Sequence, residues 1–340
     1  MRTIRLPAPA ARCAWPTSAI LSRSSQPPWS EIGAMRVVFH SESADPVQWQ
    51  KALAEQIPGL ELRVWPDVGD PAEIDAMLVW KIPPGSLDLY PNLKGIHLLS
   101  AGTDQIAGDL SIPVGLPVAR LVEPAQVSGM VEYALHAVLD YHRHFDRYRN
   151  QQAARIWHEH PRIFARDRKV GILGLGALGA PVAQALAELD FDVAGWSRQP
   201  RELEGVKIFS GWDRLEAFLR RSLILIALLP LTAETRNLFD TRFFAKMPPG
   251  SYFINIGRGA QCVETDLCAA LETGHLAGAT LDVLQSEPPE PGNPLWSAPN
   301  LILTPHVATS PDPKSGAVIV AENLRRMRDG LLPSGMVKRP

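Results

Sequence analysis

Cysteine is scarce in this chain of 340 residues, which holds only Cys13, Cys262 and Cys268. Three cysteines make no disulfide framework of the kind that small secreted proteins use, so the composition favours a reducing compartment, and we expect the cytoplasm. Cys262 and Cys268 have no second Cys or His pair nearby, and ordinary packing is therefore favoured over a metal site. We expect no bound metal.

Long apolar runs and an excess of either charge are also missing. The longest apolar run, 223–231, contains Pro230 and is shorter than the roughly 20 residues that a membrane-spanning helix needs. The 34 basic and 36 acidic residues leave a net charge of -2, which implies no polyanionic partner. We therefore expect neither a membrane nor a nucleic acid as partner. The chain is long enough for two domains.

The first 34 residues differ in composition from the rest of the chain. They hold four arginines, several serines and prolines, and no acidic residue before Glu31. This composition is typical of transit peptides, but the prolines weaken the amphipathic helix that such peptides need. Met35, followed at once by a strand-like run over 36–40, resembles a natural start. We therefore favour a disordered extension or upstream translation over a targeting signal.

A glycine-rich stretch in the middle of the chain carries most of the functional information. Gly174, Gly176 and Gly179 form a G-x-G-x-x-G pattern between a strand-like run, 170–173, and a helical pattern. The first glycine permits a tight turn, the second lets the backbone approach a pyrophosphate, and the third lets helix and strand pack closely. The N-terminus of the helix then faces the anion. The pattern predicts a dinucleotide-binding unit with a whole structural unit before it.

Strands and helices alternate on both sides of this loop. Before it, the pattern predicts strands at 36–40, 60–65, 76–80 and 93–99 and a helix at 48–56; after it, strands at 170–173, 192–196, 223–228, 252–256, 278–282 and 301–304. A long helix from about 128 to 151 links the two units, and an amphipathic tail, about 314–330, returns to the first.

This rhythm predicts an α/β protein with two Rossmann-like, doubly wound parallel-sheet domains and a cleft between them. We expect the flavodoxin-like substrate domain to comprise 35–127 and 312–340, and the NAD(P)-binding domain to comprise 128–311 with the linking helix.

Three charged residues, Arg258, Glu287 and His306, each follow a predicted strand of the second unit. Loops at that edge of a parallel sheet are where α/β proteins place their sites. Reduction of a 2-oxo acid needs a cation for the carboxylate, ideally the planar, bidentate one of arginine. It also needs a proton donor with a pKa near neutral, which histidine provides, and a carboxylate beside the histidine favours its protonated form. With hydride from a nicotinamide, the three residues predict such a reductase.

The end of the second strand of the dinucleotide unit indicates which cofactor binds. Sites that prefer NAD normally have an acidic residue there, about 20 residues after the loop, for the ribose hydroxyls. This chain has Ser197 and Arg198 instead. An acid would repel a 2′-phosphate, whereas arginine attracts it, so we expect NADP, with NADPH preferred over NADH. The alternative is that Arg198 stacks on adenine or faces solvent.

From about Met35 to its C-terminus, the chain resembles the D-isomer-specific 2-hydroxyacid dehydrogenases. The resemblance is carried by the 174–179 loop, LLPLTAET at 228–235, NIGRG at 255–259, LDV at 281–283 with EP at 287–288, and TPH at 304–306. The chain is most similar to the glyoxylate/hydroxypyruvate reductase A branch, whose marks are LVW at 78–80, AGTD at 101–104, FDRYRNQQ at 145–152, WSR at 196–198 and PLW at 294–296.

The resemblance implies NAD(P)H-dependent reduction of small 2-oxo acids such as glyoxylate and hydroxypyruvate. It implies that Arg258 binds the substrate and that His306, paired with Glu287, is the acid/base. The other implied substrate contacts are Trp80 and the backbone amides near Ala101 and Gly102. The implied cofactor contacts are Gly174, Gly176, Ala177, Leu178, Gly179, Ser197, Arg198, Leu229, Pro230, Ile256, Gly257 and Asp282, the last on the carboxamide side of the nicotinamide.

The resemblance also implies a homodimer with the linking helix at its interface and Trp157, just beyond, near the partner's substrate pocket. Two segments near the expected pocket depart from the family pattern. PAQVSG at 124–129 stands where relatives often have a Gly-rich segment, and ATSPDP at 308–313 replaces a stretch that often carries an arginine. Two alternatives therefore stay open: a reductase of bulkier 2-oxo acids, and a non-catalytic NAD(P)-sensing transcriptional corepressor. Retention of Arg258, Glu287 and His306 argues against the corepressor.

Overall fold

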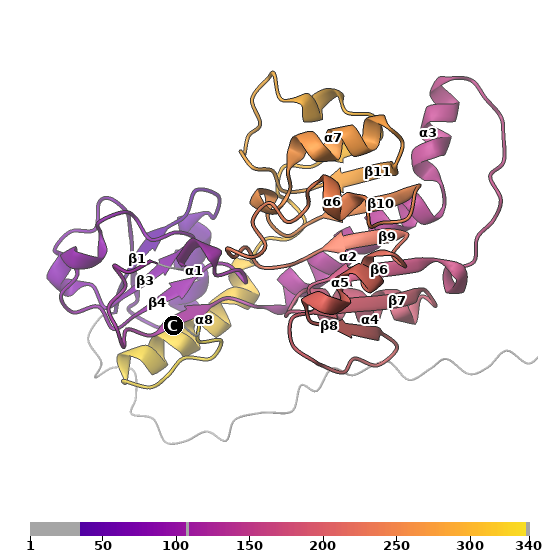
Figure 1. Ribbon diagram of the computed structural model, residues 1–340. Coiled ribbons are helices and arrows are strands. Elements are labelled where there is room, and N and C mark those ends of the chain that lie inside the picture. The colour runs from indigo at the N-terminus through magenta and orange to yellow at the C-terminus, as the bar shows by residue number, and fades with distance from the viewer. Residues whose placement is uncertain (1–34, 107–108, 338–340) are drawn as a thin grey trace, which may run out of the picture. The chain divides into compact units, whose positions relative to one another are not determined.

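The computed structural model describes residues 35–106 and 109–337, so the expected disordered extension, 1–34, lies outside the described residues. Two β-sheets organise the described chain (Figure 1). The five-stranded sheet has the order β2-β1-β3-β4-β5, and the seven-stranded sheet has the order β12-β11-β10-β9-β6-β7-β8. Neighbouring strands are parallel throughout both sheets. The predicted α/β fold with two doubly wound parallel sheets is confirmed.

The strands of the five-stranded sheet all lie within residues 36–120, and a helix from the C-terminal part of the chain packs against them. The strands are β1 (Arg36–His40), β2 (Glu61–Val64), β3 (Ala76–Val79), β4 (Gly95–Leu98) and β5 (Val118–Arg120). Helices α1 (Pro46–Gln56) and α8 (Pro313–Arg328) pack Trp49, Leu53 and Leu324 against Val37 and Phe39 of β1. Loops and short 3-10 helices cover the other face. The amphipathic tail therefore returns to the first sheet, as predicted.

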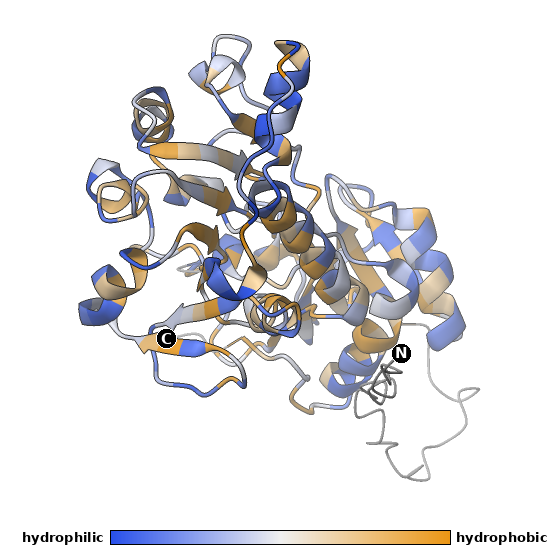
Figure 2. Cartoon of the chain, turned by 90° about the vertical axis from the view of Figure 1, so that its right-hand side faces the viewer, coloured by the Kyte–Doolittle hydropathy of each residue, from blue (hydrophilic) through white to orange (hydrophobic). Residues whose placement is uncertain are grey.

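Helices cover both faces of the seven-stranded sheet. Successive side chains of a strand point to opposite faces, and in the central strands both sets are apolar and are buried by helices. Its strands are β6 (Lys169–Leu173), β7 (Asp192–Ser197), β8 (Lys207–Ser210), β9 (Ile224–Ala227), β10 (Ser251–Asn255), β11 (Leu276–Leu281) and β12 (Leu301–Leu303). Ile224 and Ile226 pack with α2 (Pro124–His142) and α4 (Gly179–Glu188). Leu225 and Ala227 pack with α5 (Leu215–Leu219), α6 (Thr241–Phe244) and α7 (Glu264–Glu272). Figure 2 shows the resulting apolar strands in orange.

The single linking helix predicted from about 128 to 151 is wrong in two respects. Helix α2 begins earlier, at Pro124, because the Glu123 carboxylate accepts hydrogen bonds from the amides of Ala125 and Gln126 and so caps the helix. The helix also ends at His142, because His144 adopts a left-handed backbone with φ of 60°. Residues Phe145–Ala153 form a separate helix, α3.

The strand order of the seven-stranded sheet reverses between β6 and β9. Such a switch point opens a crevice at the carboxyl ends of the strands, where α/β proteins bind ligands. The loops that follow β6, β9 and β10 leave the sheet at this edge. Within the residues that the structure describes, no helix is long and apolar enough to cross a membrane.

Candidate active site

The glycine loop between β6 and α4 has the geometry that a dinucleotide phosphate requires. Gly174 has φ of 108°, and a Cβ there would lie 2.6 Å from the Leu228 carbonyl oxygen. A Cβ at Gly179, the first residue of α4, would overlap the Gly174 carbonyl oxygen. At Gly176, by contrast, a Cβ would meet nothing within 4 Å. The loop therefore leaves open space beside Gly176 and at the start of α4, where a pyrophosphate fits.

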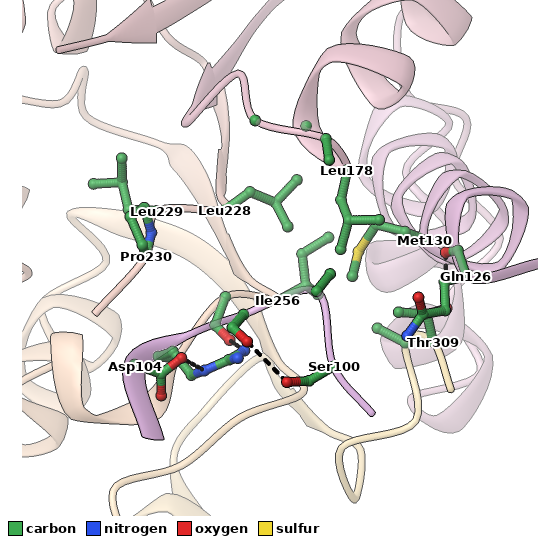
Figure 3. A pocket seen from close by; sticks show the side chains of 18 of the residues that line it. Ser100, Asp104, Gln126, Met130, Leu178, Leu228, Leu229, Pro230, Ile256 and Thr309 are labelled. Carbon is green, nitrogen blue, oxygen red and sulfur yellow. Dashed lines mark hydrogen bonds and ion pairs between the residues drawn. The ribbon is translucent and has the colours of Figure 1, made fainter. Parts of the chain in front are cut away.

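A cavity joins this loop to the loops of the five-stranded sheet (Figure 3). Figure 3 shows Leu178 and Leu228 on one side of it and Ser100 and Asp104 on the other. Most of the predicted contacts line it: Trp80, Ala101, Gly102, Gly176, Ala177, Leu178, Gly179, Leu229, Pro230, Ile256, Gly257, Arg258, Asp282 and His306. Gly174, Ser197, Arg198 and Glu287 are not part of its lining. Within the described ranges, no group of three or more His, Cys, Asp or Glu side chains is placed to hold a metal ion.

His306 and Glu287, which the sequence predicts to be an acid/base pair, are hydrogen-bonded to each other. His306 Nδ1 lies 2.8 Å from Glu287 Oε2, with side chains that are 35% and 38% exposed. The hydrogen bond to Glu287 raises the pKa of His306, although burial opposes this. Burial opposes ionisation of Glu287 as well, but the hydrogen bonds from His306 and from the Leu284 amide outweigh it and lower the pKa of this carboxyl. Because Nδ1 is engaged, Nε2 is the ring nitrogen available to a substrate.

The buried carboxylate of Asp282 holds the loop that carries His306. It accepts hydrogen bonds from the Thr304 hydroxyl at 2.6 Å and from the amides of Val307 and Ala308 at 2.8 Å each. The His306 amide donates to the Asp282 carbonyl oxygen at 2.9 Å, and His306 itself has φ of 55°. This network fixes an uncommon left-handed backbone at the histidine. Sequence reasoning missed this role of Asp282.

Arg258 is held from two directions. Its Nε donates to Asp104 Oδ1 at 2.9 Å, and its Nη1 donates to the Gly257 carbonyl oxygen at 2.8 Å. Its Nη2 lies against Gly102, where a Cβ would overlap it. A substrate carboxylate therefore cannot bind side-on across Nε and Nη2. It can approach only the end of the guanidinium that carries the two Nη atoms. Sequence reasoning named Arg258 but missed Asp104, although it stands in the AGTD motif.

Arg198 follows β7 and lies outside the cavity. Its Nη1 is 3.5 Å from Glu234 Oε2, and both side chains are mostly exposed, at 66% and 55%. Ser197 donates its hydroxyl hydrogen to the Gln199 carbonyl oxygen at 2.7 Å. Glu234 belongs to the LLPLTAET motif, but no sequence pattern indicates its contact with Arg198. Arg198 thus lies at the carboxyl end of β7, with a weak, solvent-screened partner.

Comparison with known proteins identifies the family. Residues 135–308 match the family model for the NAD binding domain of the D-isomer specific 2-hydroxyacid dehydrogenases. The glyoxylate/hydroxypyruvate reductase A of Photorhabdus laumondii is 38% identical over 308 residues, which cover 89% of this chain and 98% of the relative. The chain belongs to the D-isomer-specific 2-hydroxyacid dehydrogenase family. The similarity to the reductase A branch, expected from the motifs, is confirmed.

Solved structures of 2-hydroxyacid dehydrogenases show the same fold. The D-isomer specific 2-hydroxyacid dehydrogenase of Xanthobacter autotrophicus Py2, solved with NADPH and MES, is 40% identical with a TM-score of 0.86, covering 90% of this chain and 98% of that one. The NADPH-dependent glyoxylate/hydroxypyruvate reductase of Sinorhizobium meliloti, solved with NADP and sulfate, is 34% identical with a TM-score of 0.82, over the same shares. As a 2-hydroxyacid dehydrogenase, this chain is an oxidoreductase that acts on a small molecule.

The His306–Glu287 pair predicts how activity depends on pH. As the predicted proton donor, His306 must be protonated for reduction, and its pKa lies above the ordinary value of 6.5. We therefore expect kcat/KM to stay high above pH 6.5 and to fall as pH rises through the raised pKa. Glu287→Gln removes the negative charge that raises this pKa, so the fall should occur at lower pH. Glu290→Gln, at an exposed acid outside the pair, is the control. Identical profiles for wild type and Glu287→Gln would contradict the pairing.

Proposed function

We propose that this dehydrogenase catalyses the NADPH-dependent reduction of glyoxylate and hydroxypyruvate to the corresponding 2-hydroxy acids. The observation that carries the proposal is that His306, hydrogen-bonded to Glu287 at 2.8 Å, lines the same cavity as Arg258 and the glycine loop. The relatives named glyoxylate/hydroxypyruvate reductase A support the choice of substrates, and the neighbours solved with NADPH or NADP support the choice of cofactor.

The proposed mechanism assigns one task to each part of the site. The Nη end of Arg258 and the amides of Ala101 and Gly102, which line the cavity, hold the substrate carboxylate and polarise the carbonyl. Protonated His306 donates its Nε2 proton to the carbonyl oxygen of the substrate. The Glu287 carboxylate stabilises the protonated imidazole and fixes its orientation. Bound NADPH supplies the hydride. The residues expected to bind this cofactor are Gly174, Gly176, Ala177, Leu178, Gly179, Ser197, Arg198, Leu229, Pro230, Ile256, Gly257 and Asp282.

Cofactor preference is attributed to Arg198 after β7. When NADPH binds, its guanidinium leaves the weak ion pair with Glu234 and binds the 2′-phosphate. NADH has no such phosphate. Charge-assisted hydrogen bonds contribute about 1.5 to 3 kcal/mol, so Arg198→Ala should raise KM for NADPH by about 10- to 100-fold. The KM for NADH should change little, and the exposed Arg220→Ala is the control. If wild type prefers NADH, or if Arg198→Ala affects both cofactors equally, the assignment is wrong.

The substrate range is tested with a panel of 2-oxo acids of increasing size at saturating NADPH. One observation keeps bulkier substrates as a second candidate: a further cavity shares Trp80, Asp104, Arg258 and His306 with the first and extends toward Ser41. A higher kcat/KM for phenylpyruvate than for glyoxylate would establish the bulkier class. We do not favour the corepressor, because sensing a nucleotide requires no hydrogen-bonded acid/base pair.

We also propose a homodimer formed through the region around α3. The segment that follows the broken linking helix exposes large apolar side chains: Phe145 at 55%, Ile156 at 56%, Trp157 at 103% and Phe164 at 44%. Several large exposed apolar side chains in one segment favour a protein interface there. Sedimentation equilibrium should give about twice the chain mass of 37.3 kDa. If the protein has the mass of a monomer throughout the micromolar concentration range, the proposal is wrong.

Two further assignments remain proposals. We assign substrate binding to 35–127 with 312–340 and cofactor binding to 128–311, since α8 packs on α1 and β4 whereas α2 packs on α4 and β9. We assign the enzyme to the cytoplasm, since the two cysteines in the described residues, Cys262 and Cys268, are both unpaired.

A further inference from the structure

We propose that Asp104 is a positioning residue, which holds Arg258 in the orientation that receives the substrate carboxylate. The proposal rests on the proposed function, because it assigns Asp104 a role toward the same substrate. An acidic side chain beside the arginine that must bind an anion is not accounted for by the motifs. At first sight such an acid competes with substrate, so its presence needs a physical reason.

The contacts of Arg258 supply that reason. An arginine side chain has four rotatable bonds and three nitrogen atoms, and an unrestrained one loses considerable rotamer entropy when it binds substrate. Here Asp104 Oδ1 accepts from Nε at 2.9 Å and the Gly257 carbonyl oxygen accepts from Nη1 at 2.8 Å. The side chains of Asp104 and Arg258 are only 19% and 23% exposed. The guanidinium therefore has its orientation fixed before substrate arrives, with Nη2 against Gly102.

The same ion pair joins the two sheets. Asp104 begins the 3-10 helix η4 (Asp104–Ile106), which follows β4 of the five-stranded sheet, whereas Arg258 follows β10 of the seven-stranded sheet. The residues are 154 positions apart in the chain. No other ion pair among the described residues links residues of 35–123 to residues of 124–311. Asp104 thus determines the position of the Arg258 guanidinium relative to the amides of Ala101 and Gly102.

The loop that presents Asp104 is itself well fixed. Gln105 donates to the Ser100 hydroxyl oxygen at 2.6 Å, and Ser100 donates to the Gly102 carbonyl oxygen at 2.8 Å. Arg120, from the edge strand β5, donates to the Ala101 carbonyl oxygen at 3.1 Å. Because these bonds hold the loop from within its own sheet, Asp104 is a well-positioned acceptor, and it restrains the long side chain of Arg258.

The test compares Asp104→Ala, which removes the acceptor, with Asp104→Asn, whose amide oxygen can still accept from Nε. Displacement of a substrate-binding group by about 1 Å can cost about 100-fold, so Asp104→Ala should raise KM for glyoxylate by about 30-fold or more. Asp104→Asn should raise it by less than about 5-fold, because orientation survives without the charge. The matched control is Asp88→Ala, an exposed acid on the same part of the chain.

Binding measurements separate this role from a general loss of structure. The Kd of NADPH, followed by tryptophan fluorescence, should stay within about 3-fold of wild type in Asp104→Ala, whereas the Kd of oxalate should rise in parallel with KM. Amide hydrogen exchange without cofactor should increase over 256–261 in Asp104→Ala and not in the Asn variant. If Asp104→Ala does not fold, Asp104→Ser takes its place, because a serine hydroxyl is too short to reach Nε.

Two results would overturn the proposal. One is a folded Asp104→Ala or Asp104→Ser variant whose oxalate Kd stays within about 3-fold of wild type. The other is an equal loss of oxalate affinity in the Ala and Asn variants, which would show that charge and not orientation matters. Oxalate binding needs no turnover, so these results stand apart from the proposed function, which fails if the wild-type enzyme does not reduce glyoxylate or hydroxypyruvate.

Discussion

Replacing His306 with glutamine is expected to lower kcat for glyoxylate reduction by roughly 100- to 10,000-fold, the usual contribution of general acid–base catalysis. Glutamine retains a hydrogen-bonding group toward Glu287 but cannot deliver a proton at neutral pH. His306 lies 2.8 Å from Glu287 in a loop that Asp282 fixes through three hydrogen bonds, so the effect should come from lost proton transfer and not from a displaced loop.

The binding of NADPH gives the control for this variant. Its Kd in His306→Gln should stay near the wild-type value, because the expected phosphate site is the glycine loop, whose residues 176–179 line the cavity separately from His306. His275→Gln provides a matched histidine substitution, since His275 contacts the Phe244 carbonyl oxygen away from the cavity. Turnover that survives in His306→Gln would mean that another group donates the proton and that the proposed mechanism is wrong.

Arg258→Ala is expected to lower kcat/KM by about 1,000-fold. The variant loses the hydrogen-bond donor that stabilises the developing oxyanion, and it leaves the Asp104 carboxylate without its ion-pair partner. Without the guanidinium, the mostly buried Asp104 carboxylate would face the substrate carboxylate directly. Arg258→Lys keeps the positive charge but cannot donate to Asp104 and to substrate with the same planar geometry. It should therefore remain about 100-fold below wild type.

A double variant distinguishes the two parts of this loss. Arg258→Ala combined with Asp104→Asn removes the repulsion from Asp104, so its kcat/KM should exceed that of Arg258→Ala alone. The double variant should stay below Asp104→Asn alone, because the substrate-binding donor is still missing. If Arg258→Ala retains near-normal kcat/KM, the carboxylate is held elsewhere in the cavity and the assigned role of Arg258 is wrong.

The sequence predicted the central strands well because their apolar runs are continuous and their turns are marked by glycine and proline. It missed two of the four edge strands, although it predicted the other two, β2 and β12. β5 (Val118–Arg120) and β8 (Lys207–Ser210) were not predicted, since these short strands lack a strong apolar pattern. The broken linking helix was missed for a related reason. Helical spacing continues across His144, and only its left-handed backbone ends α2.

Reaction residues were easier to predict than the residues that hold them. Arg258, Glu287 and His306 follow strands of one sheet, so the topology alone brings them to the same edge. The Asp104–Arg258 contact joins loops of two different sheets, and no periodicity in the sequence indicates which loops meet across a cavity. The Glu234–Arg198 contact was missed because it depends on side-chain reach. Positioning contacts of this kind require coordinates.

The most direct test of the central claim is the consumption of NADPH by the purified protein when glyoxylate or hydroxypyruvate is added, with His306→Gln measured beside it. Wild type should reach a kcat/KM of about 10⁴ M⁻¹s⁻¹ or more for at least one of them, and the variant should fall at least about 100-fold below it. Failure of wild type to consume NADPH with either acid, or equal rates for wild type and His306→Gln, would show that the protein is not a reductase of these acids that uses His306 as its proton donor.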